Sequence, residues 1–220
     1  MEAQADEAAQ RQILQFMTTE HLTLQTARSA TIAEANGRCA LFIGSVSSAV
    51  VALAFIGQAS GLGEGFFLFG LVLFPSLLFL GAFTFKRVLQ TAVEDIVYAR
   101  GINRIRHYYI ESAPEVRRYF IQSSHDDTAG ALRGMAIVPT ESKWELFQTS
   151  SGMVAVINSV IGGVFAGLLS RFLISSPLYA DFAIGIACFV AGILAQRHFI
   201  VKKFADLEGR LQTLFPSDSP

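Results

Sequence analysis

Cysteine, tryptophan and charged residues are scarce in this chain, and each scarcity excludes something. Only two cysteines and one tryptophan occur among 220 residues, and 16% of the residues are charged. Without a CxxC spacing or a nearby histidine, neither a disulfide framework nor a zinc site organises the fold. We therefore predict that Cys39 and Cys188 are small buried thiols and that no metal is bound.

Motifs of catalysis are also missing. The chain contains no glycine-rich phosphate loop, no GxSxG nucleophile elbow and no HExxH metal motif. We therefore expect neither an enzyme nor a cofactor. The first 38 residues are polar, so no cleavable secretory signal is expected, and the first apolar run is predicted to act as an uncleaved signal anchor.

What the chain does have is long apolar runs. Residues 65–85 carry no charge, and 21 helical residues span roughly 30 Å, the thickness of the bilayer hydrocarbon. Two further runs cover 39–58 and 148–170. In the fourth, the charge-free part 182–196 is too short to cross by itself, so either Asp181 enters near the outer surface or Arg197 snorkels at the other end. The runs predict an all-α integral membrane protein.

Charge patterning orients these four transmembrane helices. Sixteen of the seventeen Lys and Arg residues lie before the first run, between the second and third, or after the fourth. By the positive-inside rule these segments, including both termini, are cytoplasmic, so the protein is predicted to be a multi-pass protein of a bacterial inner membrane or a plasma membrane. The predicted domains are a cytoplasmic N-terminal helix (1–38), a first transmembrane hairpin (39–85), a cytoplasmic helical segment (86–147) with a loop at 123–142, a second hairpin (148–196), and a cytoplasmic C-terminal helix and tail (197–220).

The cytoplasmic extensions carry helix signals of their own. We expect an apolar stripe in the first one to pack on another helix: Ile13, Met17, Leu24, Ala27 and Thr31. Ser112 as the cap and Pro114 in the first turn predict a helix over 114–122. Another helix is predicted over 141–147, with Trp144 as an interfacial anchor. The last is an amphipathic tail helix that reaches Leu214.

Small residues and one proline shape the predicted spans. Small residues spaced for close helix packing occur in two of them: Gly44, Ser48 and Ala52 in the first, and Ser159, Gly163 and Gly167 in the third. Four such spans offer more packing surface than one protomer can bury, so we expect a homo-oligomer. Pro75 predicts a kink in the second span, either as a gate or simply as shape.

Polar residues within or near the apolar runs are functional candidates because burying them in lipid is costly. Asn158 either hydrogen-bonds a neighbouring helix or lines a pore. Arg171 and Asp181 either pair at the outer end of the second hairpin or are interfacial residues without a function.

Two polar clusters fall in the central cytoplasmic segment. The basic cluster of Arg100, Arg104, Arg106, Arg117 and Arg118 could contact an anionic lipid or a partner, but ordinary positive-inside charge and pairing with neighbouring acidic residues explain it as well. No nucleic acid is expected. The His125-Asp126-Asp127 sequence could hold a metal with His21 or His107, but we predict a solvated loop.

Two functions follow from this layout. In the first, the chain is a homo-oligomeric, membrane-anchored interaction, sensing or effector protein that acts through its cytoplasmic helices, with the lipid bilayer and a cytoplasmic protein as partners. The alternative is an oligomeric ion channel or small-solute pore.

Overall fold

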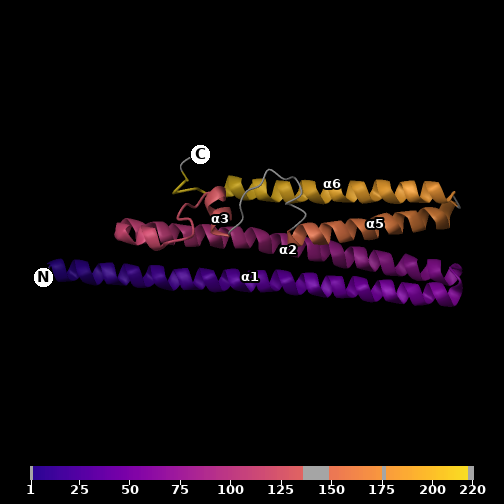
Figure 1. Ribbon diagram of the computed structural model, residues 1–220, viewed down its shortest axis with the longest axis horizontal. Coiled ribbons are helices and arrows are strands. Elements are labelled where there is room, and N and C mark those ends of the chain that lie inside the picture. Colours follow the sequence, from indigo (N-terminus) through magenta and orange to yellow (C-terminus); the bar gives the residue numbers. More distant parts are fainter. Residues whose placement is uncertain (1, 136–148, 175–176, 218–220) are drawn as a thin grey trace. The chain divides into compact units, whose positions relative to one another are not determined.

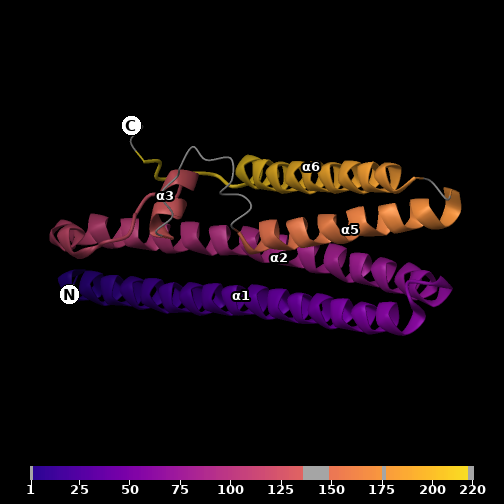
Figure 2. The same cartoon turned by 45° about the vertical axis from the view of Figure 1, so that its right-hand side comes forward.

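The computed structural model describes residues 2–135, 149–174 and 177–217. Its elements are α1 (Glu2–Ser60), α2 (Glu64–Ser112), the 3₁₀ helix η1 (Pro114–Tyr119), α3 (Thr128–Gly134), α5 (Ser150–Ile174) and α6 (Leu178–Arg210). All secondary structure in the described ranges is helical. α1 packs beside α2, and α5 beside α6 (Figures 1 and 2).

The main helices are long and apolar. α1 has 59 residues, or roughly 90 Å at 1.5 Å per residue, about three times the bilayer hydrocarbon thickness. Among the described residues, four helices (α1, α2, α5 and α6) are long and apolar enough to cross a membrane. α1 and α2 are so long that most of each would extend beyond such a crossing.

The apolar parts of these helices are largely uncovered by the chain itself. Only 6% of the most apolar window of α6 is buried, and 33% of that of α5. Phe79, Phe182 and Leu41 are 77%, 70% and 74% exposed. A water-soluble bundle would turn such side chains inward, because large exposed apolar surface is unfavourable in water. The exposure therefore suits contact with a lipid bilayer.

The chain divides into two compact units. Unit 1 comprises Met1–Ala33, Thr91–Glu141 and Asp206–Pro220, and unit 2 comprises Glu34–Gln90 and Ser142–Ala205. The predicted domain limits are not tested by this division and stay predictions.

Unit 2 holds the larger apolar core, to which α1, α2, α5 and α6 all contribute. Phe42, Leu89, Val154 and Ile200 are almost fully buried there. The turn from α1 to α2 places Gly61 and Leu62 at φ 59° and 60°, a left-handed conformation that glycine adopts without strain.

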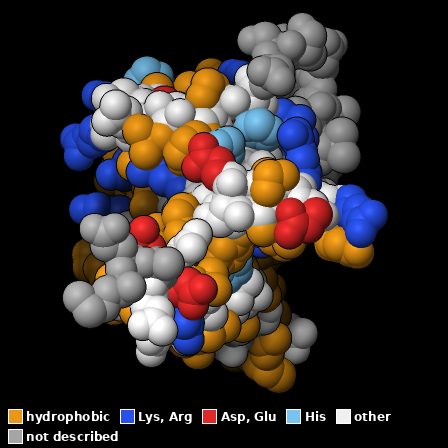
Figure 3. Space-filling view, turned by 90° about the vertical axis from the view of Figure 1, so that its left-hand side faces the viewer, with side chains coloured by type: hydrophobic (Ala, Val, Ile, Leu, Met, Phe, Trp, Pro, Cys, Tyr) orange, Lys and Arg blue, Asp and Glu red, His pale blue; other side chains and the backbone are white. Residues whose placement is uncertain are grey.

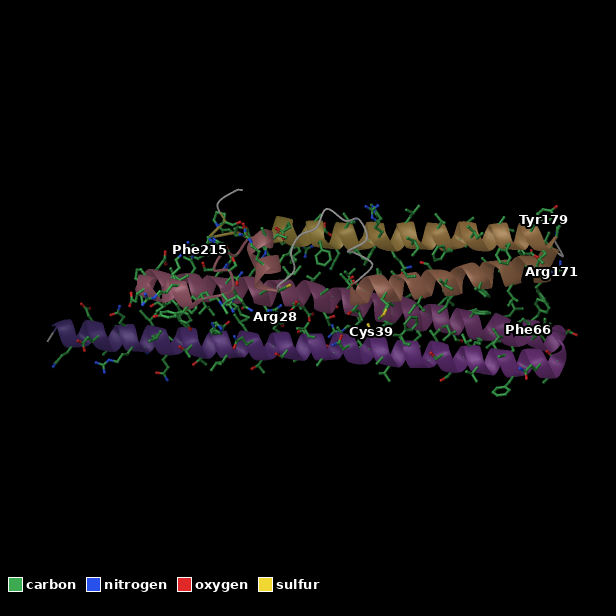
Figure 4. The ribbon with its side chains drawn as sticks, in the orientation of Figure 1. Arg28, Cys39, Phe66, Arg171, Tyr179 and Phe215 are labelled. Atoms are coloured by element: carbon green, nitrogen blue, oxygen red, sulfur yellow. The ribbon has the colours of Figure 1, made fainter. Side chains whose placement is uncertain are left out.

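Close packing and ion pairs join α1 to α2 within each unit. In unit 1, a Cβ on Gly101 would lie 2.9 Å from Leu24, so the absence of a side chain lets the helices approach here. Arg28 of α1 (Figure 4) donates from Nε to Asp95 of α2 at 2.6 Å. In unit 2, Arg87 donates two hydrogen bonds to Glu34, at 2.9 and 3.1 Å.

The predicted packing stripe on the first helix is partly covered by this arrangement. Thr31 is buried, and Met17, Leu24 and Ala27 are partly buried, whereas Ile13 is 43% exposed. Burial of the stripe therefore increases along α1, from the exposed Ile13 to the buried Thr31.

Several local predictions were wrong. The helix expected over 114–122 is the shorter 3₁₀ helix η1, the loop expected at 123–142 contains α3, and α6 stops at Arg210, so that Leu214 is not helical. Cys188 is exposed, although Cys39 is buried as predicted. The helix predicted over 141–147, with Trp144, lies outside the described residues.

Candidate functional site

The most elaborate polar arrangement of unit 1 surrounds the sequence His125-Asp126-Asp127. After η1, the chain reaches α3, for which Asp127 is the N-cap: its Oδ1 accepts from the backbone N–H of Gly130 at 2.6 Å. Aspartate is a favoured residue at this position because it satisfies a helix N–H that has no partner within the helix. Gly130 is required there, since a Cβ would overlap the carbonyl oxygen of His125.

Asp126 is the centre of the arrangement, and its side chain is fully buried. Its carboxylate accepts from Arg104 Nε at 2.6 Å and from the backbone N–H groups of Leu214 and Phe215 at 3.1 and 2.7 Å. The backbone N–H of Asp126 in turn donates to the carbonyl of Phe215 at 3.1 Å. A buried carboxylate is costly unless it is paired and hydrogen-bonded in this way.

The C-terminal tail completes the site from the other side. The backbone N–H and the hydroxyl of Ser217 both donate to Asp127 Oδ2, and Arg104 donates to the carbonyl of Gln212. The ring of Phe215 (Figure 4) stacks on His107 with centroids 3.8 Å apart. We name this set the Asp126 clasp: Arg104, His107, Asp126, Asp127 and the tail residues 212–217.

Burial and hydrogen bonding set the ionisation of both aspartates. Burial opposes ionisation of Asp126, but the N–H groups of Phe215 and Leu214 together with Arg104 outweigh it and lower its pKa. For Asp127 burial is likewise outweighed, chiefly by Ser217 and Gly130, and the pKa is lowered. Hydrogen bonds to the charged form act in this direction. Both groups are therefore carboxylates at neutral pH, as the clasp requires.

Further polar residues of α2 support the clasp. Arg100 is 2% exposed and donates to Thr128 Oγ1 at 2.8 Å and to Glu208. Asn103, also buried, donates to the carbonyl of His125 at 2.8 Å, and Arg106 donates to Asn103 Oδ1 at 3.0 Å.

The basic cluster predicted from sequence is thus divided. Arg100, Arg104 and Arg106 belong to this internal network. Their partners lie in the loop before α3, in α3, in α6, in the tail and on α2 itself, rather than being the acidic residues adjacent in sequence. Arg117 and Arg118 lie on η1 and are exposed. Arg118 stands over the ring of Tyr119, 4.9 Å from its centroid.

The prediction of a solvated loop at His125-Asp126-Asp127 was wrong. Asp126 is fully buried and Asp127 partly buried, because the tail and α2 enclose them. Among the described residues, no group of three His, Cys, Asp or Glu side chains could hold a metal ion.

In unit 2, Asn158 packs between helices. It lies against Gly81 of α2, where a Cβ would overlap its Oδ1, and that Oδ1 has no hydrogen-bond partner among the described residues. Asn158 belongs to α5 and faces α2 here, and a role in a pore stays a prediction. Pro75 lies inside α2, which continues through it.

The small residues of the third span serve contact between α5 and α6. A Cβ on Gly163 would lie 2.7 Å from the carbonyl oxygen of Gly185, and one on Gly167 would lie 3.1 Å from that of Asp181. Ser159 accepts from Gln196 Nε2 of α6 at 2.8 Å. Sequence reasoning did not single out Gln196, which also donates to the carbonyl of Ala155 at 3.1 Å.

The small residues of the first span have no such neighbour. A Cβ on Gly44 would meet nothing within 4 Å, Ser48 is exposed and Ala52 is partly buried. This face of α1 is therefore open within the described part of the chain.

Arg171 and Asp181 lie near the link between α5 and α6 (Figure 4 labels Arg171). Both line an apolar groove of about 620 Å³ between these helices, to which Phe67 of α2 also contributes. Asp181 is 6% exposed, whereas Arg171 is exposed.

Comparison with protein-family models, curated proteins and solved structures finds no match to the chain. The class that the described ranges define is a helical protein, with four candidate membrane-spanning helices among those residues.

Proposed function

We propose that this chain is a polytopic membrane protein whose unit 2 anchors it in the bilayer as two helix hairpins and whose unit 1 is a cytoplasmic interaction or sensing module. The apolar windows that the chain leaves exposed support the anchor. The placement of sixteen of seventeen Lys and Arg residues outside the two hairpin links supports cytoplasmic termini.

The observation that carries the module is the Asp126 clasp. It joins three segments far apart in sequence: the end of α2, the loop before α3 and the tail after α6. Buried ionic networks of this kind are rarely more stabilising than apolar packing. We propose that this one instead holds the three segments in a single arrangement. A tail held by a few hydrogen bonds is also an element that a partner can displace, which suits sensing or recruitment.

We further propose that the protein is a homo-oligomer. The open face of Gly44 and Ser48 on α1 allows the close approach of another helix.

Substituted-cysteine accessibility tests the proposed membrane arrangement. In a Cys39→Ala, Cys188→Ala background, Leu62→Cys places an exposed thiol in the link between α1 and α2, and Tyr179→Cys places one in the first turn of α6, beside the second link. Tyr119→Cys places a thiol on η1. A membrane-impermeant maleimide should label the two link variants in intact cells and the Tyr119→Cys variant only after permeabilisation. Labelling of Tyr119→Cys from outside would refute the cytoplasmic module.

Light scattering on the detergent-solubilised protein tests the oligomer separately. A mass of two or more chains is expected, and Gly44→Leu should reduce it. A monomeric mass for the unsubstituted protein would refute the oligomer without affecting the topology.

A further inference from the structure

Unit 1 contains a second polar feature beside the clasp, a pocket of about 300 Å³. Its wall combines the loop 120–125 with Ile110 at the end of α2, Arg117 of η1 and Arg133 of α3. The volume lies at the lower end of the range for small-molecule sites. Figure 3, which faces this end of α2, shows Lys, Arg and His side chains interspersed with Asp, Glu and hydrophobic ones.

The polar side chains of this wall present hydrogen-bond donors. The carbonyl oxygen of the Gln122 side chain accepts from Arg106, which leaves its NH₂ group to donate. Ser123 Oγ accepts from the backbone N–H of His125 at 3.1 Å, which leaves the hydroxyl proton to donate. Arg117 and Arg133 add two guanidinium groups.

Negative charge near the pocket is already committed elsewhere. None of the described residues that line it is acidic. Asp126, the next residue along the chain, bonds Arg104 and the tail, and Asp127 bonds Gly130 and Ser217. Asp127 also interacts electrostatically with Arg133 and offsets part of its charge. The positive charge that remains for a ligand is therefore that of Arg117 and part of that of Arg133.

The pocket also has an apolar side. Ile110 and Phe120 line it together with the donors, and Ile121, which is fully exposed, lies at its edge. A ligand that fits both sides has an anionic group with several acceptor oxygens and a small apolar or ring-bearing part. Phosphate offers three terminal oxygens and matches arginine pairs in geometry, whereas a carboxylate offers two.

We propose that this pocket binds a phosphomonoester, with Arg117 and Arg133 holding the phosphate, Gln122 and Ser123 donating to it, and Ile110 and Phe120 covering the organic part. The phosphate is carried either by a free small molecule or by a phospholipid headgroup. The inference deepens the proposed function by naming the ligand class that unit 1 senses, and it depends on that function only for the cytoplasmic source of the ligand.

Binding to the purified full-length chain tests the site independently of topology. Phenyl phosphate and inorganic phosphate are the probes for a free ligand, measured by calorimetry in an uncharged detergent. Saturable binding is expected, tighter for phenyl phosphate because its ring covers the apolar wall. Arg117→Gln and Arg133→Gln should each weaken binding by about tenfold or more, as expected for loss of a charge-assisted hydrogen bond.

Arg118→Gln is the matched control. Arg118 precedes Tyr119 on the same 3₁₀ helix and carries the same charge, but it does not line the pocket. It should bind phenyl phosphate as the unsubstituted protein does. Equal losses in Arg118→Gln and Arg117→Gln would reveal general charge attraction and overturn the pocket.

A lipid arm distinguishes the two sources. Nanodiscs of phosphatidylcholine with and without phosphatidic acid are compared for competition with phenyl phosphate. Competition only in the phosphatidic acid discs supports a headgroup ligand, and undiminished phenyl phosphate binding in both supports a free one. No saturable binding of any probe, or binding unchanged by the Arg117→Gln, Arg133→Gln double substitution, refutes the proposal. Neither result bears on the cysteine-accessibility test of the membrane arrangement.

Discussion

Removing one charge at the centre of the clasp should release the C-terminal tail. In Asp126→Asn, the side chain keeps its shape, but one of its two acceptor oxygens becomes an NH₂ group that faces donors. The carboxylate accepts from two backbone N–H groups of the tail and from Arg104, whose side chain is 37% exposed. The substitution therefore acts first on residues 212–217.

The magnitude follows from these bonds. Hydrogen bonds to a charged group contribute about 1.5–3 kcal/mol each, and a part-exposed ion pair contributes less than about 1 kcal/mol. Since Asn retains one acceptor, the tail should lose roughly 2–3 kcal/mol of docking free energy. At about 1.4 kcal/mol per tenfold change, the tail should open roughly 30 to 150 times more often.

Hydrogen exchange read by mass spectrometry measures this opening directly. The amides of Leu214 and Phe215 donate to Asp126, so a peptide covering them should exchange faster by that factor in Asp126→Asn. The amides around Val88 and Leu89 in the core of unit 2 should not change, which shows that the variant is folded.

Two further variants test whether the effect on tail exchange is specific to Asp126. Asp206→Asn removes an exposed carboxylate of unit 1 and should leave tail exchange unchanged. Asp127→Asn keeps a good N-cap for α3 but weakens the bonds to Ser217, so its effect should be confined to the end of the tail. Unchanged exchange of Leu214 and Phe215 in Asp126→Asn would refute the clasp as the reason that the tail is docked.

Three further predictions concern packing, pH and the membrane. Gly163→Ala should destabilise the α5–α6 pair by about 1–3 kcal/mol, because the new Cβ overlaps the carbonyl oxygen of Gly185. The control is Gly162→Ala, whose Cβ meets only Leu78 at 3.7 Å. An equally low thermal midpoint in both variants would contradict the Gly163–Gly185 contact. Acidification should destabilise unit 1. Burial and then Arg106 lower the pKa of His21, so the stability that neutral His21 contributes is fully present above about pH 6.5 and declines below it. The pKa values of Asp126 and Asp127 are also lowered, so unit 1 loses further stability below about pH 4. Thermal midpoints measured against pH check this, and Asp126→Asn with the same acid slope as the unsubstituted protein would count against it. Cys188, exposed on α6, should resist a hydrophilic maleimide in membranes and react in SDS, because lipid excludes the reagent; rapid reaction in intact membranes would exclude a lipid-facing α6.

The long helices could be predicted from the sequence because their signals are local. An uncharged run such as 65–85 satisfies its backbone only as a helix when it lies in lipid, and no proline or glycine cluster interrupts residues 86–110. The absence of turn signals likewise predicted a helix that continues past Lys86, as α2 does. Helix ends were less predictable: the amphipathic pattern near Leu207 and Leu211 suggested further helix, but the segment leaves helical geometry after Arg210 and gives its N–H groups to Asp126 and Asp127 instead.

The candidate site could not be predicted in the same way, because its parts are far apart in the chain. Asp126 and Phe215 are 89 residues apart, and nothing near either residue indicates the other. Of the clasp, only the N-cap role of Asp127 had a local signal, an aspartate before Thr128 and a short apolar stretch. Arg104 and Asp126 were each singled out in the sequence, one in a basic cluster and the other in an expected loop, but not as partners.

The sequence by itself determined that the chain is helical, that four of its helices are apolar enough for a bilayer, and that positive charge is concentrated outside the hairpin links. These properties depend on composition and period, which every stretch carries within itself. Only the tertiary structure decided which polar groups are buried and what they bond. A side chain such as Asp126 looks solvated in sequence, and it becomes the centre of a site because folding brings an arginine and two backbone amides to it and removes water from its carboxylate.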